Sequence, residues 1–208
     1  MKKLITEDEV KRILKNGGNE ILIEKGSVVS PLALDRIRHS GLKIIHDKPG
    51  TSSDRQNNLK IAIGSDHTGV KAKKSVYDFL KTKGLDIIDV GTFTEDAVDY
   101  PDIAFNVANR VSIGEVTRGI ILDATGIPSA ITANKIPGIR AATCYNEFSA
   151  RSSREHNDAN ILVMGARALG EETIKSIVDV WLKSDFLGDR HQKRLDKIKL
   201  IEEKYSKK

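Results

Sequence analysis

Short apolar runs alternate with segments of helical periodicity along most of the chain, from residue 59 onward. The runs predict five strands, at residues 61–64, 87–90, 120–122, 139–144 and 161–164. The periodic segments predict helices at residues 70–83, 101–113, 128–135, 147–157 and 171–184. Short buried strands alternating with helices are typical of a parallel sheet covered on both faces, so the pattern predicts an α/β fold with a doubly wound five-stranded sheet.

The first 46 residues follow another pattern. Thr6 begins a capping box that predicts a helix to about residue 15, and Ser30 with Pro31 predicts a second helix through residue 39. Strands are expected at residues 20–24 and 42–45, and no internal repeat is apparent. Residues 1–46 therefore predict a small α+β extension, marginal in stability by itself, that serves as a docking or targeting module.

The polar, turn-rich residues 47–58 predict a linker between this extension and a domain that spans residues 59–208. At the end of that domain, residues 191–205 predict a C-terminal helix whose apolar stripe consists of Leu195, Ile198, Ile201 and Tyr205. Because exposed apolar stripes are unfavourable in water, this helix is expected to pack on the domain or on a partner.

Composition and charge narrow the class of protein. The net charge of +5 is carried by the basic tail after residue 189, without interleaved aromatic residues, which argues against a nucleic-acid surface. The single cysteine, Cys144, excludes an internal disulfide and favours a reducing, cytoplasmic compartment. It lies in an apolar strand and is expected to be a buried small residue. No apolar run is long enough to cross a bilayer, so no membrane partner is expected.

Candidate chemistry begins where the apolar run 120–122 ends in Asp123, followed by Thr125 and Gly126. Ligands bind at the carboxyl ends of parallel strands, and small residues there let backbone N–H groups approach a phosphate or a developing oxyanion. Asp123 is therefore expected to face a ligand. The same residues also fit an ordinary turn in which Asp123 caps the next helix, and the sequence leaves both interpretations open.

Further polar residues lie close to the ends of the predicted strands. They are Asp66, His67, Tyr100, His156, Asn157 and Arg167. Arg190 and Arg194 are spaced i, i+4, so both guanidinium groups lie on one helix face and could grip one phosphate. Structural roles are the alternative: Asp66 as a helix cap, His156 as a helix C-terminal residue, and the arginines as solvated or ion-paired side chains. No ligand spacing supports a metal site.

Five motifs carry a resemblance to a known family. In order, they are Ser-Asp-His-x-Gly, Asp-Tyr-Pro, Thr-Gly-Ile with Ala-Asn-Lys, His-Asn-Asp, and Gly-x-Arg-His-Gln-x-Arg. From residue 59 to its end, the chain resembles the sugar-phosphate isomerases that comprise type B ribose-5-phosphate isomerase and the two galactose-6-phosphate isomerase subunits. The resemblance implies a Rossmann-like α/β/α sandwich and an enzyme without a metal or other cofactor. It also implies dimers or tetramers whose sites are completed across a subunit interface.

The resemblance implies roles for individual residues. The residues that would bind the phosphorylated sugar are Asp66, His67, Tyr100, Gly126, Ser129, Asn157, Arg167, Arg190 and Arg194. Of these, His67 and the three arginines would hold the phosphate. His156 matches the histidine that helps to open the furanose ring, and Thr125 matches a threonine that helps in ring opening or positioning.

The chain departs from the family in the loop that follows residue 122. Type B enzymes usually carry Cys-Gly-Thr-Gly-x-Gly there, with the cysteine as the base that moves a proton between C2 and C1, whereas residues 123–128 read Asp-Ala-Thr-Gly-Ile-Pro. Some relatives place a glutamate at the position of Ser129. Asp123 with Ser129 instead resembles the galactose-6-phosphate isomerase subunit that lacks the cysteine and works with a partner subunit, although that subunit lacks the histidine matching His67.

A carboxylate can replace the cysteine as the base, although a free Asp is a weak base and the role requires a dry environment. Pro128 has no N–H and removes one donor from the loop. The sequence therefore predicts an aldose–ketose isomerase, by default for ribose 5-phosphate, with Asp123, His156 and Thr125 as catalytic residues. The alternatives are a sugar-phosphate-binding protein that has lost the base and a subunit that needs a partner chain. Residues 1–46 weakly resemble leader regions of bacterial microcompartment enzymes, which would add that compartment to the cytoplasm as a location.

Overall fold

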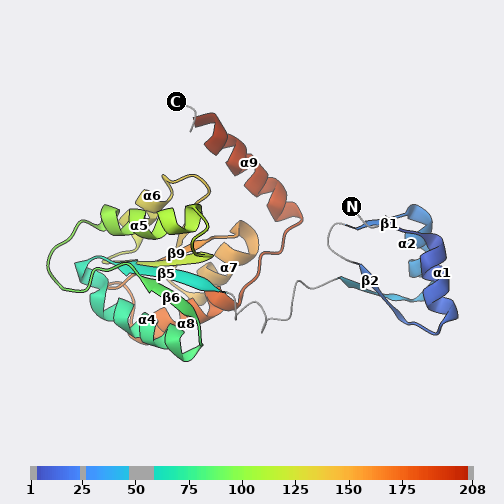
Figure 1. The fold of residues 1–208 in the computed structure, drawn as a ribbon, viewed down its shortest axis with the longest axis horizontal. Coiled ribbons are helices and arrows are strands. Elements are labelled where there is room, and N and C mark those ends of the chain that lie inside the picture. Colours follow the sequence, from blue (N-terminus) through green and yellow to red (C-terminus); the bar gives the residue numbers. More distant parts are fainter. Residues whose placement is uncertain (1–3, 24–26, 47–58, 206–208) are drawn as a thin grey trace. The chain divides into compact units, whose positions relative to one another are not determined.

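The computed structural model describes residues 4–23, 27–46 and 59–205. The chain divides into two compact units, Met1–Thr51 and Ser52–Lys208 (Figure 1). Each unit has its own hydrophobic core. The expected linker at residues 47–58 lies outside the described residues.

The first unit is a small α+β structure built around two pairs of parallel strands. Its elements are β1 (Leu4–Ile5), α1 (Glu7–Lys15), β2 (Glu20–Ile23), β3 (Val28–Val29), α2 (Pro31–Ser40) and β4 (Lys43–His46). β1 pairs with β3, and β2 pairs with β4. Both helices begin at the predicted caps, because Thr6 Oγ1 accepts a hydrogen bond from the Glu9 amide and Ser30 Oγ accepts one from the Ala33 amide. The short strands β1 and β3 were not predicted.

The first unit consists of two copies of a strand-helix-strand motif, so the expectation of no internal repeat is wrong. The segments β1-α1-β2 and β3-α2-β4 have the same order of elements, and each strand of one pairs with its counterpart in the other. A Ser or Thr cap precedes each helix, and a glycine in the left-handed region follows it, Gly17 in the first half and Gly41 in the second. The two halves share this pattern with few identical residues, which is why sequence inspection missed the repeat.

The second unit contains the predicted five-stranded parallel sheet. Its strands are β5 (Lys60–Ser65), β6 (Asp86–Asp89), β7 (Arg118–Asp123), β8 (Ala141–Thr143) and β9 (Ile161–Gly165), in the order β6-β5-β7-β9-β8. The helices are η1 (His67–Gly69), α4 (Val70–Thr82), α5 (Tyr100–Ser112), α6 (Ile127–Ala133), α7 (Glu147–Asn157), α8 (Glu171–Lys183) and α9 (Arg190–Tyr205). The predicted α/β fold is confirmed, and β8 is shorter than expected.

Helices cover both faces of this sheet, as the prediction of a doubly wound sheet requires (Figure 1). On one face Ile61, Ile63 and Leu122 pack in a core with residues of α4 and α8 that include Leu80 and Trp181. On the other face the alternate strand residues pack against α5 and α6. Because successive strand residues point to opposite faces, these buried strands read as continuous apolar runs in the sequence.

The strand order fixes where a ligand can bind. The chain passes from β5 to β6 on one side and then crosses to β7 on the other side of β5. At such a reversal the crossover connections leave a crevice at the carboxyl ends of the two strands. The ends of β5 and β7 are in contact here, since the Asp66 amide donates to the Leu122 carbonyl at 3.1 Å. In the part of the chain that the structure describes, no helix is long and apolar enough to cross a membrane.

Candidate active site

Asp66 and His67 lie at the crevice where β5 ends. Asp66 is buried and caps η1, with Oδ1 accepting hydrogen bonds from the Thr68 amide at 2.8 Å and from Thr68 Oγ1 at 2.6 Å. His67 Nδ1 accepts a hydrogen bond from the Val98 amide at 3.3 Å. A neutral His67 therefore carries its proton on Nε2, which can donate to an anionic ligand.

Asp123 ends β7, and its carboxylate turns back into the loop that follows. Oδ1 accepts hydrogen bonds from the amides of Thr125, at 2.8 Å, and Gly126, and Oδ2 accepts one from the Ser129 amide at 3.1 Å. The side chain is only 1% exposed. The carboxylate thus fills the place among the loop N–H groups where the sequence predicted an external anion, and this is the geometry of the alternative in which Asp123 caps the next helix.

The loop after Asp123 crosses the end of β9 at very short range. A Cβ atom added to Gly165 would lie 2.6 Å from the Thr125 carbonyl oxygen, so only glycine fits beneath the loop. The Ala166 amide donates to the Asp123 carbonyl at 2.7 Å, and the Arg167 amide donates to the Ala124 carbonyl at 3.1 Å. The structure therefore brings Asp66, His67, Arg167 and the loop of Thr125, Gly126 and Ser129 to one edge of the sheet.

A second group of predicted residues meets where α7 ends and α9 begins. His156 and Asn157 are the last residues of α7, and Arg190 is the first residue of α9, one turn before Arg194. The imidazole of His156 stacks on that of His191, with ring centroids 4.4 Å apart and planes 8° from parallel. His156 Nδ1 is paired with Ser152 Oγ at 3.1 Å. Its Nε2 is therefore the ring nitrogen available to a substrate.

His191 is a residue that sequence reasoning missed, although it lies between the two arginines of the last motif. It is buried, and Nε2 accepts a hydrogen bond from Arg190 Nε at 3.3 Å. Desolvation lowers the pKa of His191, and the nearby His156, Arg190 and Arg194 lower it further, while Asp189 opposes them. The stack therefore favours a neutral His191 beside His156.

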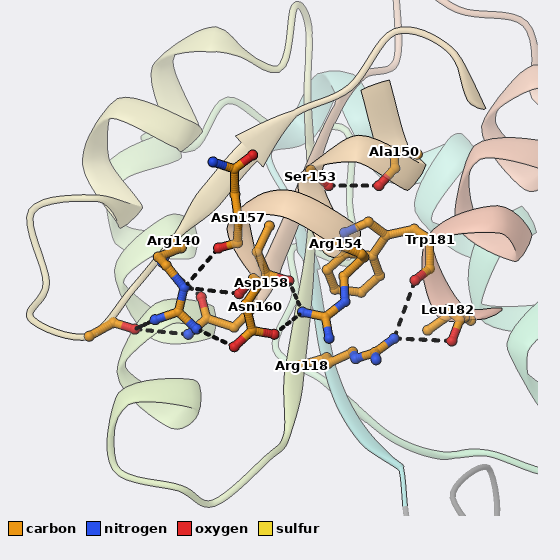
Figure 2. A network of polar contacts seen from close by, with 12 residues as sticks. Arg118, Arg140, Ala150, Ser153, Arg154, Asn157, Asp158, Asn160, Trp181 and Leu182 are labelled. Atoms are coloured by element: carbon orange, nitrogen blue, oxygen red, sulfur yellow. Dashed lines mark hydrogen bonds and ion pairs between the residues drawn. The ribbon is translucent and has the colours of Figure 1, made fainter. Parts of the chain in front are cut away.

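Three arginines, also missed, form a polar network near the ends of α7 and α8 (Figure 2). Arg154 Nη1 donates to Asp158 Oδ1 at 2.9 Å, and Arg140 Nη2 donates to Asp158 Oδ2 at 2.9 Å. Arg118 donates to the carbonyls of Trp181 and Leu182, and burial lowers its pKa to about 10. The Trp181 ring lies 5.1 Å from the Arg118 guanidinium and 5.7 Å from that of Arg154. Arg140 and Arg154 thus anchor the last turn of α7, which carries His156 and Asn157.

The two groups of site residues are not joined within one chain. In residues 59–205, no hydrogen bond or ring contact links Asp66, His67 or the loop of Asp123 to His156 or to the arginines of α9.

The remaining predicted residues lie outside these two groups. Tyr100 begins α5 and is 38% exposed. Cys144 is buried and its pKa is raised by burial, which confirms the expectation of a buried small residue. The described residues contain no cluster of three His, Cys, Asp or Glu side chains suited to a metal ion.

The second unit is similar to known isomerases over most of its length. A family model described as Ribose/Galactose Isomerase matches residues 61–198. The putative sugar phosphate isomerase YwlF of Bacillus subtilis is 46% identical over 147 residues, which are 70% of this chain and 99% of that protein. Ribose-5-phosphate isomerase B of Escherichia coli is 44% identical over 145 residues, 70% of this chain and 97% of that protein.

Solved structures agree with these relatives. The structure of ribose-5-phosphate isomerase B from Clostridium thermocellum superposes with a TM-score of 0.70 at 52% identity, covering 71% of this chain and 99% of that one. The resemblance expected from the five motifs is thus confirmed. The crevice residues, the strand order and these matches together place the chain in the Ribose/Galactose Isomerase family.

Proposed function

We propose that the protein interconverts a phosphorylated aldose and the corresponding ketose through an enediolate, with ribose 5-phosphate and ribulose 5-phosphate as the default pair. The observation that carries this proposal is the loop of residues 123–129 beside Asp66 and His67, at the strand reversal. It is supported by the 44% identity, over 145 residues, to ribose-5-phosphate isomerase B of Escherichia coli. A cytoplasmic location is part of the proposal and fits a chain whose only cysteine is a buried free thiol.

The proposed roles follow the two groups of residues. His67, Arg167, Arg190 and Arg194 would hold the phosphate, because guanidinium groups and a neutral imidazole N–H donate to phosphate oxygens. His156 would act on the sugar ring oxygen through Nε2, since Nδ1 is held by Ser152. Thr125 would assist ring opening, and the residues that would contact the sugar are Asp66, Tyr100, Gly126, Ser129 and Asn157.

Asp123 is the proposed base because it occupies the position of the family's usual cysteine. For this role Oδ2 is the available oxygen, since it accepts only the Ser129 amide, whereas Oδ1 accepts the amides of Thr125 and Gly126. The loop must also admit the substrate, because Asp123 is only 1% exposed. That same observation favours a second candidate function, a protein that binds the sugar phosphate without turning it over. In that case Asp123 only shapes the loop.

We further propose that the site is completed by a second copy of the chain. The separation of the two residue groups supports this, because the arginines of one copy would then meet the loop of the other. The apolar stripe of α9 supports it too, since Ile198, Ile201 and Tyr205 are 50%, 60% and 63% exposed. They line a groove of about 730 Å³ between α9 and the rest of the unit. A galactose-6-phosphate isomerase-like partner chain is the alternative occupant.

Proton NMR of ribose 5-phosphate in D₂O with the full-length protein tests the chemistry. We expect ribulose 5-phosphate to form and C2 of the remaining ribose 5-phosphate to take up deuterium, because the base exchanges the abstracted proton with D₂O before the enediolate is protonated again. Both should be lost in Asp123→Ala and in Asp123→Asn, the latter keeping an oxygen that can accept from the loop amides. If the wild type shows neither signal while ribose 5-phosphate still raises its melting temperature, the catalytic proposal fails for this sugar. Binding without turnover of the hexose 6-phosphates as well would leave the second candidate.

A further inference from the structure

The loop that carries Asp123 is held by its carbonyl groups as well as by its amides. The carbonyls of Asp123 and Ala124 accept hydrogen bonds from backbone amides at the end of β9. The next two carbonyls accept from side chains of the segment that ends β8: Tyr145 Oη donates to the Thr125 carbonyl at 3.0 Å, and Thr143 Oγ1 donates to the Gly126 carbonyl at 2.7 Å. Four successive carbonyls are thus fixed from neighbouring strands, and the last two depend on the identity of a side chain.

The Tyr145 hydroxyl and the Asp123 carboxylate form hydrogen bonds with opposite ends of one peptide group. The Thr125 carbonyl and the Gly126 N–H belong to the same planar unit and point in opposite directions. Tyr145 holds the oxygen and Asp123 accepts from the N–H. Any rotation of this peptide would therefore break both contacts at once and would remove one of the three amide donors that orient the Asp123 carboxylate.

This peptide is also the one in the loop most prone to rotate. Gly126 has φ +82°, in the left-handed region, and glycine adopts positive and negative φ at similar cost. Rotation of the peptide that precedes such a glycine interconverts two ordinary turn types. A specific contact on the Thr125 carbonyl is thus needed to keep one orientation dominant.

Tyr145 is well placed to supply that contact. Its backbone directly precedes Asn146, which caps α7 through a reciprocal pair of hydrogen bonds with Ser149. Its own amide donates to Ser149 Oγ at 3.3 Å. The side chain is 42% exposed, so its packing contributes less to stability than that of a core residue. Loss of the hydroxyl is therefore expected to change the orientation of the loop peptide and to leave the overall fold intact.

We propose that Tyr145 is a positioning residue of the isomerase site, which fixes the peptide between Thr125 and Gly126 and thereby the Asp123 carboxylate. The inference rests on the proposed function and deepens it. Tyr145 acts through the loop and forms no bond with the reacting atoms.

Tyr145→Phe removes the hydroxyl and keeps the ring, and Tyr77→Phe on α4 is the matched control. With the sugar phosphate that the wild-type protein isomerises, we expect kcat to fall about five-fold in Tyr145→Phe, the effect of losing one hydrogen bond. KM should stay within about two-fold, because the phosphate-binding arginines are untouched. Tyr77→Phe should match the wild type in both constants. A kcat for Tyr145→Phe equal to that of the control would overturn the inference.

Amide hydrogen exchange measured by NMR provides a readout that does not depend on turnover. The Gly126 amide should exchange about five-fold faster in Tyr145→Phe than in Tyr77→Phe at the same pH and temperature, because its orientation toward Asp123 is no longer enforced. If the Gly126 amide exchanges faster in Tyr145→Phe but the wild-type protein isomerises no sugar phosphate, the proposed function is rejected. The role of Tyr145 in fixing the loop is then still supported. Unchanged exchange would reject the role of Tyr145 whatever the activity.

Discussion

At the scale of single residues, the structure shows that the position of a carboxylate in the sequence does not fix what its oxygens contact. Asp123 is the proposed base, and both of its oxygens accept hydrogen bonds from the loop that follows. These bonds place a buried negative charge among three N–H dipoles, which compensates its loss of hydration. Proton transfer by Asp123 would therefore use Oδ2, which accepts only one of these bonds and keeps a lone pair free.

The buried His191 makes stability depend on pH in a direction that can be predicted. Its folded-state pKa lies below the ordinary value of 6.5, so the unfolded chain binds the proton more readily. The contribution of the neutral His191 side chain to the free energy of unfolding is complete above about pH 6.5. It is lost as the pH falls from there through the lower folded-state pKa of His191. Urea unfolding at fixed protein concentration should therefore show a larger drop in midpoint between pH 7.5 and pH 5 for the wild type than for His191→Gln. Identical drops would show that His191 does not titrate differently in the folded state.

At the scale of secondary-structure elements, short contacts between neighbouring strand ends and helix ends shape the site. The loop after β7 passes over β9 only because Gly165 has no side chain, and α7 ends where Asp158 turns into the left-handed region with φ 45°. Arg140 and Arg154 bind opposite oxygens of Asp158. The end of α7, and with it His156, is therefore fixed by an ion-pair network that the amphipathic pattern of the helix does not reveal.

Removing the Asp158 carboxylate should loosen this helix end. We expect Asp158→Ala to lower the free energy of unfolding by about 2 kcal/mol, because the buried Arg154 keeps its charge and loses its carboxylate partner. Asp158→Asn should lose less, since Asn tolerates the left-handed conformation and retains an acceptor oxygen. Denaturant unfolding of both variants measures the difference. Equal stability of the alanine variant and the wild type would show that the network contributes no stability.

At the scale of the whole molecule, the chain joins the isomerase unit, which is the second unit, to a first unit that lies outside the family match. The relatives match about 70% of this chain and nearly all of their own length, within the second unit. The first unit has a separate core built from the two halves of its repeat. We propose that it serves as a docking or targeting module, because the second unit contains the full extent of the family's fold.

This division predicts the effect of truncation. A protein that consists of residues 59–208 should keep the kcat of the full chain to within about two-fold and unfold at a similar temperature, because its core is complete without the first unit. Steady-state kinetics, thermal unfolding and light scattering at one protein concentration test this expectation. A ten-fold loss of kcat in a folded truncated protein would instead assign the first unit a part in the site.

Sequence by itself determined the elements and their class. Apolar periodicity is a local property, so it located the five strands of the sheet, the helices that follow them and the caps at Thr6 and Ser30. Continuous apolar runs separated by helices are compatible with few folds other than a parallel sheet covered on both faces. The motifs at the strand ends then indicated which edge of that sheet carries the chemistry.

Only the tertiary structure decided which groups face one another. Tyr145 reaches Thr125 from 20 residues away, Arg118 meets Trp181 across 63 residues, and His156 stacks on a histidine of another helix. The orientation of the Asp123 carboxylate depends on the path of a whole loop, and the pairing of the first unit's two halves depends on strands of two and four residues. Such contacts join segments that are distant along the chain, and they form only after the elements have packed, so no local pattern of apolar and polar residues encodes them.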